Sequence, residues 1–198
     1  MSTSPALEKF RQSAHNTAKA ALQQIPQDER EDVYALSFWF TRDDDDPRYP
    51  KIIISYNTFS HFQQSIEDAS DEKEAKWNYA FWSQEDIDVI GGENDEGLAA
   101  WLKGTPWYYT DEEDEAAEED DDELFDELME RGDAFNEAFI NEIIALTRSL
   151  FEEGFISSVF GKNIPVLIHE LEYYDKPLAW TRAANPPGLA DEFIAAYK

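Results

Sequence analysis

The stretch DAFNEAFINEIIALTRSLFEEG, residues 133–154, decides the fold, and the rest of the chain can be placed relative to it. Its apolar residues recur every three or four positions, which is the spacing of one face of an amphipathic helix. They are Phe135, Phe139, Ile143, Leu146 and Leu150. Asp133 is expected to cap the start of this helix, because its carboxylate can accept a hydrogen bond from an unpaired backbone amide in the first turn. Gly154 is expected to end the helix, since glycine enters the left-handed conformation without steric cost.

The remaining apolar patterns predict further helices and a few strands. Ser4 and Pro5 are typical of a helix start, and the short polar turn after residue 40 favours an antiparallel hairpin. Besides the central helix, helices are expected at residues 4–24, 58–76, 96–103 and 189–197. Strands are expected at residues 32–40, 51–57, 77–82 and 164–171. This order predicts an α+β fold with a small, mainly antiparallel sheet and helices packed on it.

Length and composition favour one domain over residues 1–198. The chain has 6 Trp, 9 Tyr and 13 Phe, and this length can bury roughly 70% of the unfolded surface. The absence of Cys excludes disulfides, thiolate metal sites and a cysteine nucleophile, and it fits a reducing cytosol. The sequence has no signal-peptide pattern and no apolar run of roughly 20 residues. We therefore expect a soluble, cytoplasmic protein that does not enter a membrane.

Charge is the unusual property of this chain. The formal net charge is −28, and residues 111–130 contain 14 acidic residues and no basic one. Such a field repels nucleic acid and anionic membranes and attracts a basic protein or a cation. Residues 111–123 are therefore interpreted as an acidic low-complexity insertion that precedes the central helix. The residues expected to contact a basic partner are Tyr108, Tyr109, Asp111, Glu112, Glu113, Asp114, Glu115, Glu118, Glu119, Asp120, Asp121, Asp122 and Glu123.

Each of these features also has a simpler interpretation. The acidic run can be a solvated loop or a frayed helix that serves solubility alone. The apolar residues that follow it can anchor it to the body or form the centre of an interface; they are Leu124, Phe125, Leu128 and Met129. Trp107 is expected in the core, whereas Tyr108 and Tyr109 fit either a core or an interface.

No motif predicts catalysis, a metal site or a cofactor. The histidines show no zinc-binding spacing, the acidic segments lack the EF-hand order of ligands, and neither a GxSxG elbow nor a phosphate-binding loop is present. His169 is expected to be a partly buried, hydrogen-bonded residue and His61 to be exposed. An enzyme or metal-dependent protein that uses carboxylates from separate segments stays an alternative hypothesis.

Four segments together carry a resemblance. They are VYALSFWF at 33–40, WNYAFW at 77–82, FGKNIPVLIHELEYYD at 160–175 and NPPG at 185–188. This combination resembles an uncharacterised bacterial family of about 200 residues, a domain of unknown function, whose pattern does not include the acidic run. The chain is also similar in size and acidity to immunity proteins encoded beside polymorphic toxins, which implies neither catalytic nor binding residues here.

The sequence thus predicts an acidic protein-interaction module that binds a basic protein, with an immunity or inhibitor protein against a toxin as the finer form. A nucleic-acid mimic is a second alternative, because carboxylates can occupy a groove built for phosphates. That role requires charges fixed on an ordered surface, whereas a single flexible run fits it poorly.

Overall fold

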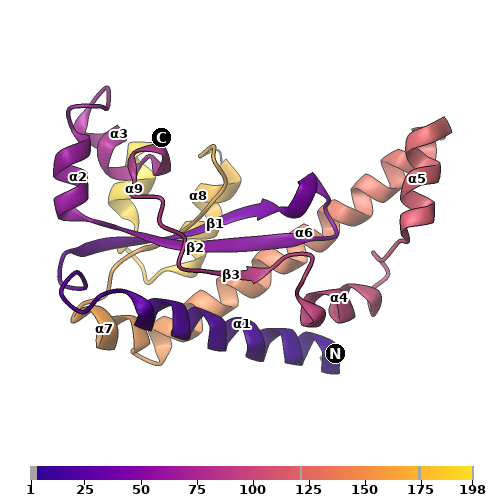
Figure 1. Cartoon of the computed structure of the whole chain (residues 1–198), viewed down its shortest axis with the longest axis horizontal. Coiled ribbons are helices and arrows are strands. Elements are labelled where there is room, and N and C mark those ends of the chain that lie inside the picture. The colour runs from indigo at the N-terminus through magenta and orange to yellow at the C-terminus, as the bar shows by residue number, and fades with distance from the viewer. Residues whose placement is uncertain (1–3, 121, 174, 198) are drawn as a thin grey trace.

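The predicted hairpin forms the centre of the sheet. The computed structural model describes residues 4–120, 122–173 and 175–197 (Figure 1). Strand β1 pairs antiparallel with β2, which pairs antiparallel with β3, and the strand order in this four-stranded sheet is β3-β2-β1-β4. The strands are β1 Val33–Arg42, β2 Pro50–Thr58, β3 Asp88–Gly91 and β4 Val166–His169. The predicted α+β fold with a mainly antiparallel sheet is confirmed.

One expectation about the sheet needs correction. Residues 77–82 do not form a strand: Trp77 ends a helix, and Tyr79–Phe81 form a 3-10 turn that begins where the Asn78 side chain accepts from the Ala80 amide. The third strand is β3 instead. The last strand, β4, lies at the sheet edge and pairs parallel with β1, so the sheet is mixed. Parallel pairing places the C-terminal ends of β1 and β4 at the same edge.

The helices cover both faces of the sheet (Figure 1). Phe38 of β1 faces the larger core, which contains residues of α1, α4, α6 and α7, whereas Ala35 faces a smaller core with residues of α3 and α9. The helices are α1 Pro5–Gln24, α2 Phe59–Ser65, α3 Glu72–Trp77, α4 Glu96–Lys103, α5 Asp111–Asp120, α6 Asp122–Glu152, α7 Phe155–Phe160, α8 Asp175–Ala184 and α9 Asp191–Ala196. The predicted helix over 58–76 is therefore two helices, α2 and α3. None of the helices in the described ranges has the length and apolar character needed to cross a bilayer.

The central helix is longer than its apolar periodicity indicates. Helix α6 begins at Asp122, so Asp133 lies within it and does not cap it. The carboxylates of Asp122 and Glu123 stand in its first turn, where negative charge stabilises the positive end of the helix dipole. The helix ends at Glu152, and Gly154 adopts the expected left-handed conformation with a φ of 67°. The extra turns at the start of α6 carry the acidic region away from the sheet (Figure 1).

Candidate functional site: the acidic arm

The acidic run forms an ordered pair of helices. Helix α5 folds back beside the first turns of α6, at the end of the molecule remote from α2, α3 and α9 (Figure 1). Tyr109, Ala117 and Leu128 are buried together where the two helices meet, and Leu124 packs against them. We name residues 111–130 the acidic arm. The arm has a small apolar core of its own, which a solvated run of like charges would lack.

A reciprocal pair of hydrogen bonds starts α5. The Glu113 amide donates to the Thr110 hydroxyl at 3.2 Å, and the Thr110 amide donates to the Glu113 carboxylate at 2.8 Å. This is a capping box, which satisfies two amide groups that a helix start leaves without partners. Thr110 followed three residues later by Glu113 is a signal that the sequence did contain and that the interpretation as an insertion overlooked.

Arg48 joins the arm to the turn between β1 and β2. Its guanidinium contacts Asp46 at 2.6 Å, Asp111 at 2.7 Å and Asp114 at 3.0 Å, and only 8% of the residue is exposed. Burial alone lowers the pKa of this guanidinium, but the hydrogen bonds to Asp46 and Asp111 and the charges of Asp46 and Asp114 raise it further than burial lowers it. Arg48 thus stays charged and holds two carboxylates of α5 against the body.

The predicted partner-binding residues fall into two groups. Tyr109 is only 2% exposed, because its ring lies beneath the Arg48 guanidinium at 4.9 Å, and Asp111 and Asp114 are engaged by the same Arg48. The side chains that face solvent are those of Tyr108, Glu112, Glu113, Glu115, Asp122 and Glu123. The side chains of Glu118, Glu119 and Asp120, and Asp121 as a whole, lie outside the described residues. Trp107, which was expected in the core, is half-buried and packs against it.

The apolar residues of the arm divide between its core and its surface. Leu128 faces α5, whereas Phe125 and Met129 point outward with 44% and 41% exposed. These two residues are four positions apart, so they lie next to each other on one face of α6. Asp122, Asp126 and Glu130 are exposed along one side of this pair. The arrangement is an apolar patch bordered by acidic residues, which is typical of a protein interface.

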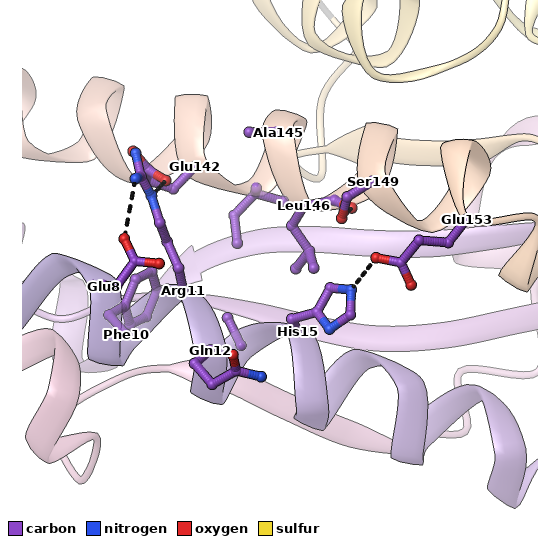
Figure 2. A pocket seen from close by; sticks show the side chains of 12 residues that line it. Glu8, Phe10, Arg11, Gln12, His15, Glu142, Ala145, Leu146, Ser149 and Glu153 are labelled. Atoms are coloured by element: carbon purple, nitrogen blue, oxygen red, sulfur yellow. Dashed lines mark hydrogen bonds and ion pairs between the residues drawn. The ribbon is translucent and has the colours of Figure 1, made fainter. Parts of the chain in front are cut away.

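A second concave surface lies between α1 and α6. This groove has a volume of about 360 Å³ and an apolar floor that includes Phe10 and Leu146. Figure 2 shows an ion pair near each end of it. Arg11 donates to Glu142 at 2.6 and 2.8 Å, and His15 contacts Glu153 at 2.9 Å.

These groups hold α1 against α6. Lys19 also contacts Glu153, and its hydrogen bond, together with that of His15, lowers the pKa of this carboxyl. Ser149 lies in the same groove, but its hydroxyl donates to the Leu146 carbonyl at 2.7 Å, so it is already engaged in its own helix. The charges of the groove pair with one another, which is the arrangement of a helix contact more than of a catalytic centre.

The remaining histidines have structural partners. His169 is hydrogen-bonded as expected, but it is almost completely buried and not partly buried. The Glu170 carbonyl accepts from Nδ1 at 2.7 Å, which leaves Nε2 to accept from the Ser37 hydroxyl at 2.7 Å. His61 is half-buried and not exposed, because its Nε2 lies 3.1 Å from the Phe81 carbonyl. Among the described residues, no group of three or more histidine or acidic side chains is placed to hold a metal ion.

Comparison of the chain with known proteins found no matching family model, no similar curated protein and no similar solved structure. The function therefore has to be inferred from the residues themselves and from their geometry. The acidic arm is the part of the described surface that contains most of the predicted partner-binding residues. It combines fixed carboxylates with an exposed apolar pair.

Proposed function

We propose that this protein is an acidic interaction module and that the acidic arm binds a basic protein. The observation that carries the proposal is the exposed pair Phe125 and Met129, which lies beside a row of exposed carboxylates on an ordered helix. Apolar contacts at the centre would supply affinity, and the carboxylates would select a cationic surface. The finer form of the proposal is an immunity or inhibitor protein whose basic partner is a toxin.

The rigidity of the arm supports this role. Binding is weakened when a surface must be ordered first, since each immobilised side chain costs about 0.5–1.5 kcal/mol. Here the capping box and the Arg48 contacts already hold α5 in place before any partner arrives. The net charge of −28 would also accelerate the encounter with a basic protein, and added salt would slow that encounter.

Affinity capture from a lysate of the native cells tests the proposal with two matched variants. One neutralises the exposed arm residues Glu112, Glu113, Glu115 and Glu123 as Gln and leaves the Arg48 contacts intact. The control neutralises four exposed acids elsewhere, as Asp28→Asn, Glu31→Gln, Glu67→Gln and Asp68→Asn. Each set changes the formal net charge from −28 to −24.

We expect the wild type and the control to retain one basic protein at low salt, and the arm variant to lose it. A Phe125→Ser, Met129→Ser variant with unchanged charge should lose it as well. Retention of the same protein by the arm variant, or after deletion of residues 111–123, would show that the arm is not the binding surface. Inhibition assays on the captured protein would then test the immunity form.

The order of the arm also favours the nucleic-acid mimic as a second candidate. Such a mimic needs carboxylates at fixed spacing, and a capped helix provides this better than a flexible run. The two candidates differ in whether the partner binds nucleic acid at the site that this chain occupies. If duplex DNA or RNA displaces this chain from the captured protein, the mimic is supported, and if saturating nucleic acid leaves the complex intact, the mimic is excluded.

A further inference from the structure

A cleft separate from the α1–α6 groove lies where β1 and β4 end, between α6 and α8. Arg42 is the last residue of β1, Glu170 follows β4, and both line this cleft. Its volume is about 490 Å³. This is the edge of the sheet at which the two parallel strands, β1 and β4, end together. The lining side chains used below are Phe40, Arg42, Glu130, Asp133, Asn136, Glu137, Glu170, Lys176 and Trp180.

The cleft contains hydrogen-bonding groups that no described residue satisfies. Asn136 is only 5% exposed, and its Nδ2 donates to the Gly132 carbonyl at 2.9 Å, but its Oδ1 accepts no hydrogen bond. The Nε of Arg42 is a buried donor without an acceptor. Within the described ranges only four buried side-chain atoms lack a partner, and these two line the same cleft. A buried group left unpaired costs about 1–3 kcal/mol, so a ligand that pairs both would gain that much from each.

The charges and aromatic rings of the lining favour a cation. Four carboxylates line the cleft, from Glu130, Asp133, Glu137 and Glu170, against the two cations Arg42 and Lys176. Trp180 stands edge-on to Phe40 at 6.0 Å and forms an aromatic wall against which a guanidinium or ammonium group can stack. Arg42 lies 5.3 Å from the Phe40 ring and forms no ion pair with a described residue.

The cleft continues the surface of the acidic arm. At 3.6 residues per turn, Phe125, Met129 and Asn136 fall within about 40° of one another around α6. Asp133, one turn after Met129, lies on the adjoining flank and lines the cleft. A partner segment that lies along this face of α6 would therefore pass from the arm into the cleft.

We propose that the cleft receives one arginine or lysine side chain of the basic partner, a proposal that rests on the proposed function. The cation donates to Asn136 Oδ1 and to the surrounding carboxylates, and it stacks on Trp180. Arg42 Nε donates to a backbone carbonyl oxygen of the same segment. The arm thus supplies electrostatic attraction, and the cleft supplies the specificity for one basic side chain.

Small blocked amino acids test the cleft without knowledge of the partner. The probes are N-acetyl-L-argininamide, its uncharged isostere N-acetyl-L-citrullinamide, agmatine, which lacks a carbonyl, and free L-arginine. Binding of each probe is measured by amide chemical shifts and by Trp fluorescence. We expect the argininamide to bind at least about tenfold more tightly than the citrullinamide, and more tightly than agmatine or free arginine. Equal binding of the citrullinamide would overturn the cation assignment. Tighter binding of free arginine would identify a free amino acid as the ligand and overturn the assignment to a protein segment.

Two variants locate the binding. Glu137→Gln removes one exposed carboxylate of the cleft and should weaken binding of the argininamide at least about fivefold. Glu152→Gln, an exposed acid on the same helix outside the arm and the cleft, should leave this binding unchanged. Asn136→Leu should weaken the probe and leave the free protein at least as stable as the wild type, because it removes an unpaired buried acceptor. A destabilised Asn136→Leu protein that binds the probe normally would show that Asn136 is only structural.

The failure of this proposal can be told apart from failure of the proposed function. If no probe binds the cleft but capture of the partner still depends on the arm, the cleft assignment is wrong and the interaction module stands. If the probes bind and Glu137→Gln weakens them while no basic protein is retained, the cleft is a cation site and the proposed function is wrong.

Discussion

A single residue, Arg48, holds the acidic helix α5 in a fixed position against the β1–β2 turn. Without it, Asp46, Asp111 and Asp114 would repel one another where α5 meets the β1–β2 turn. The guanidinium can contact three carboxylates because its planar fork presents five donors along its edges, and the ring of Tyr109 lies 4.9 Å from it. The position of α5 therefore depends on one buried cation.

Replacing this cation should destabilise the whole chain. We expect Arg48→Leu to lower the free energy of unfolding by about 2–3 kcal/mol, less than for a fully buried pair because the Asp111 carboxylate is largely exposed. Arg48→Lys keeps the charge but loses the fork, so its loss should be smaller. Urea unfolding followed by Trp fluorescence measures both. A free energy for Arg48→Leu within about 0.5 kcal/mol of the wild type would contradict a structural role.

His169 should make stability depend on pH. Burial lowers the pKa of His169 to about 4 from 6.5, although the hydrogen bond to the Glu170 carbonyl opposes this. Below pH 6.5 the unfolded chain gains a proton that the folded protein takes up only near pH 4, so stability falls as the pH drops through this window. The loss is about 3 kcal/mol once both states are protonated.

The variant His169→Gln isolates this effect from the many carboxylates. Urea unfolding at pH values from 7 to 5 should give a steeper loss of stability for the wild type than for the variant, which lacks the titrating ring. The difference between the two curves is the relevant quantity, because the carboxylates contribute equally to both. Parallel curves would mean that His169 titrates equally in the folded and unfolded chain.

Sequence reasoning reached some residues and missed others for identifiable reasons. The Ser4 cap, the left-handed Gly154 and the hydrogen-bonded His169 follow from local chemistry, and the structure confirms them. Arg48 could not be recognised, because RDDDDPR looks like any polar turn until α5 is folded against it. The unpaired atoms of Arg42 and Asn136 are likewise properties of packing, which no spacing in the sequence reveals.

At the scale of elements, α6 depends on close contact with the β1–β2 turn. Gly132 lies buried within α6, and a Cβ added there would meet the Pro47 ring at 2.6 Å. Glycine inside a helix costs about 1 kcal/mol relative to alanine, so its presence there needs a reason. The reason is this approach, which brings the turn carrying Asp46 and Arg48 against the start of the central helix.

We expect Gly132→Ala to destabilise the protein by about 1–3 kcal/mol despite the gain in helix propensity, because the contact forces the helix and the turn apart. Gly104→Ala is the matched control. Gly104 has a φ of −89°, and an added Cβ would come no closer than 3.4 Å to any atom, so its effect should be small. Thermal unfolding of the two variants compares them directly. A more stable Gly132→Ala protein would show that the β1–β2 turn can shift away from the added methyl group at little cost.

The elements that sequence reasoning got wrong share a cause. Residues 77–82 are rich in aromatic side chains, which favour strands, but the Asn78 side chain turns the chain at once and the rings fill the smaller core. The start of α6 was placed eleven residues late, because the helix continues through acidic residues whose apolar partners belong to α5. In both places a contact distant in sequence overrides the local pattern.

At the scale of the molecule, the net charge of −28 acts against the folded state. Folding brings the carboxylates closer together, so their repulsion is greater in the native protein than in the extended chain. Sodium chloride screens this repulsion, since the Debye length falls from about 30 Å at 0.01 M to about 10 Å at 0.1 M. We therefore expect the urea midpoint to rise over this range of salt. An unchanged or lower midpoint would mean that attractive ion pairs outweigh the repulsion.

An acidic arm that is ordered before any partner binds is the feature on which the proposed interaction depends most. Amide hydrogen exchange of residues 111–120 measures this order directly. In the wild type these amides should exchange at least about tenfold more slowly than in an unstructured chain, and Arg48→Leu should remove most of this protection. Exchange at the unstructured rate in the wild-type protein would contradict the account, because the run would then be a solvated chain and not a binding surface.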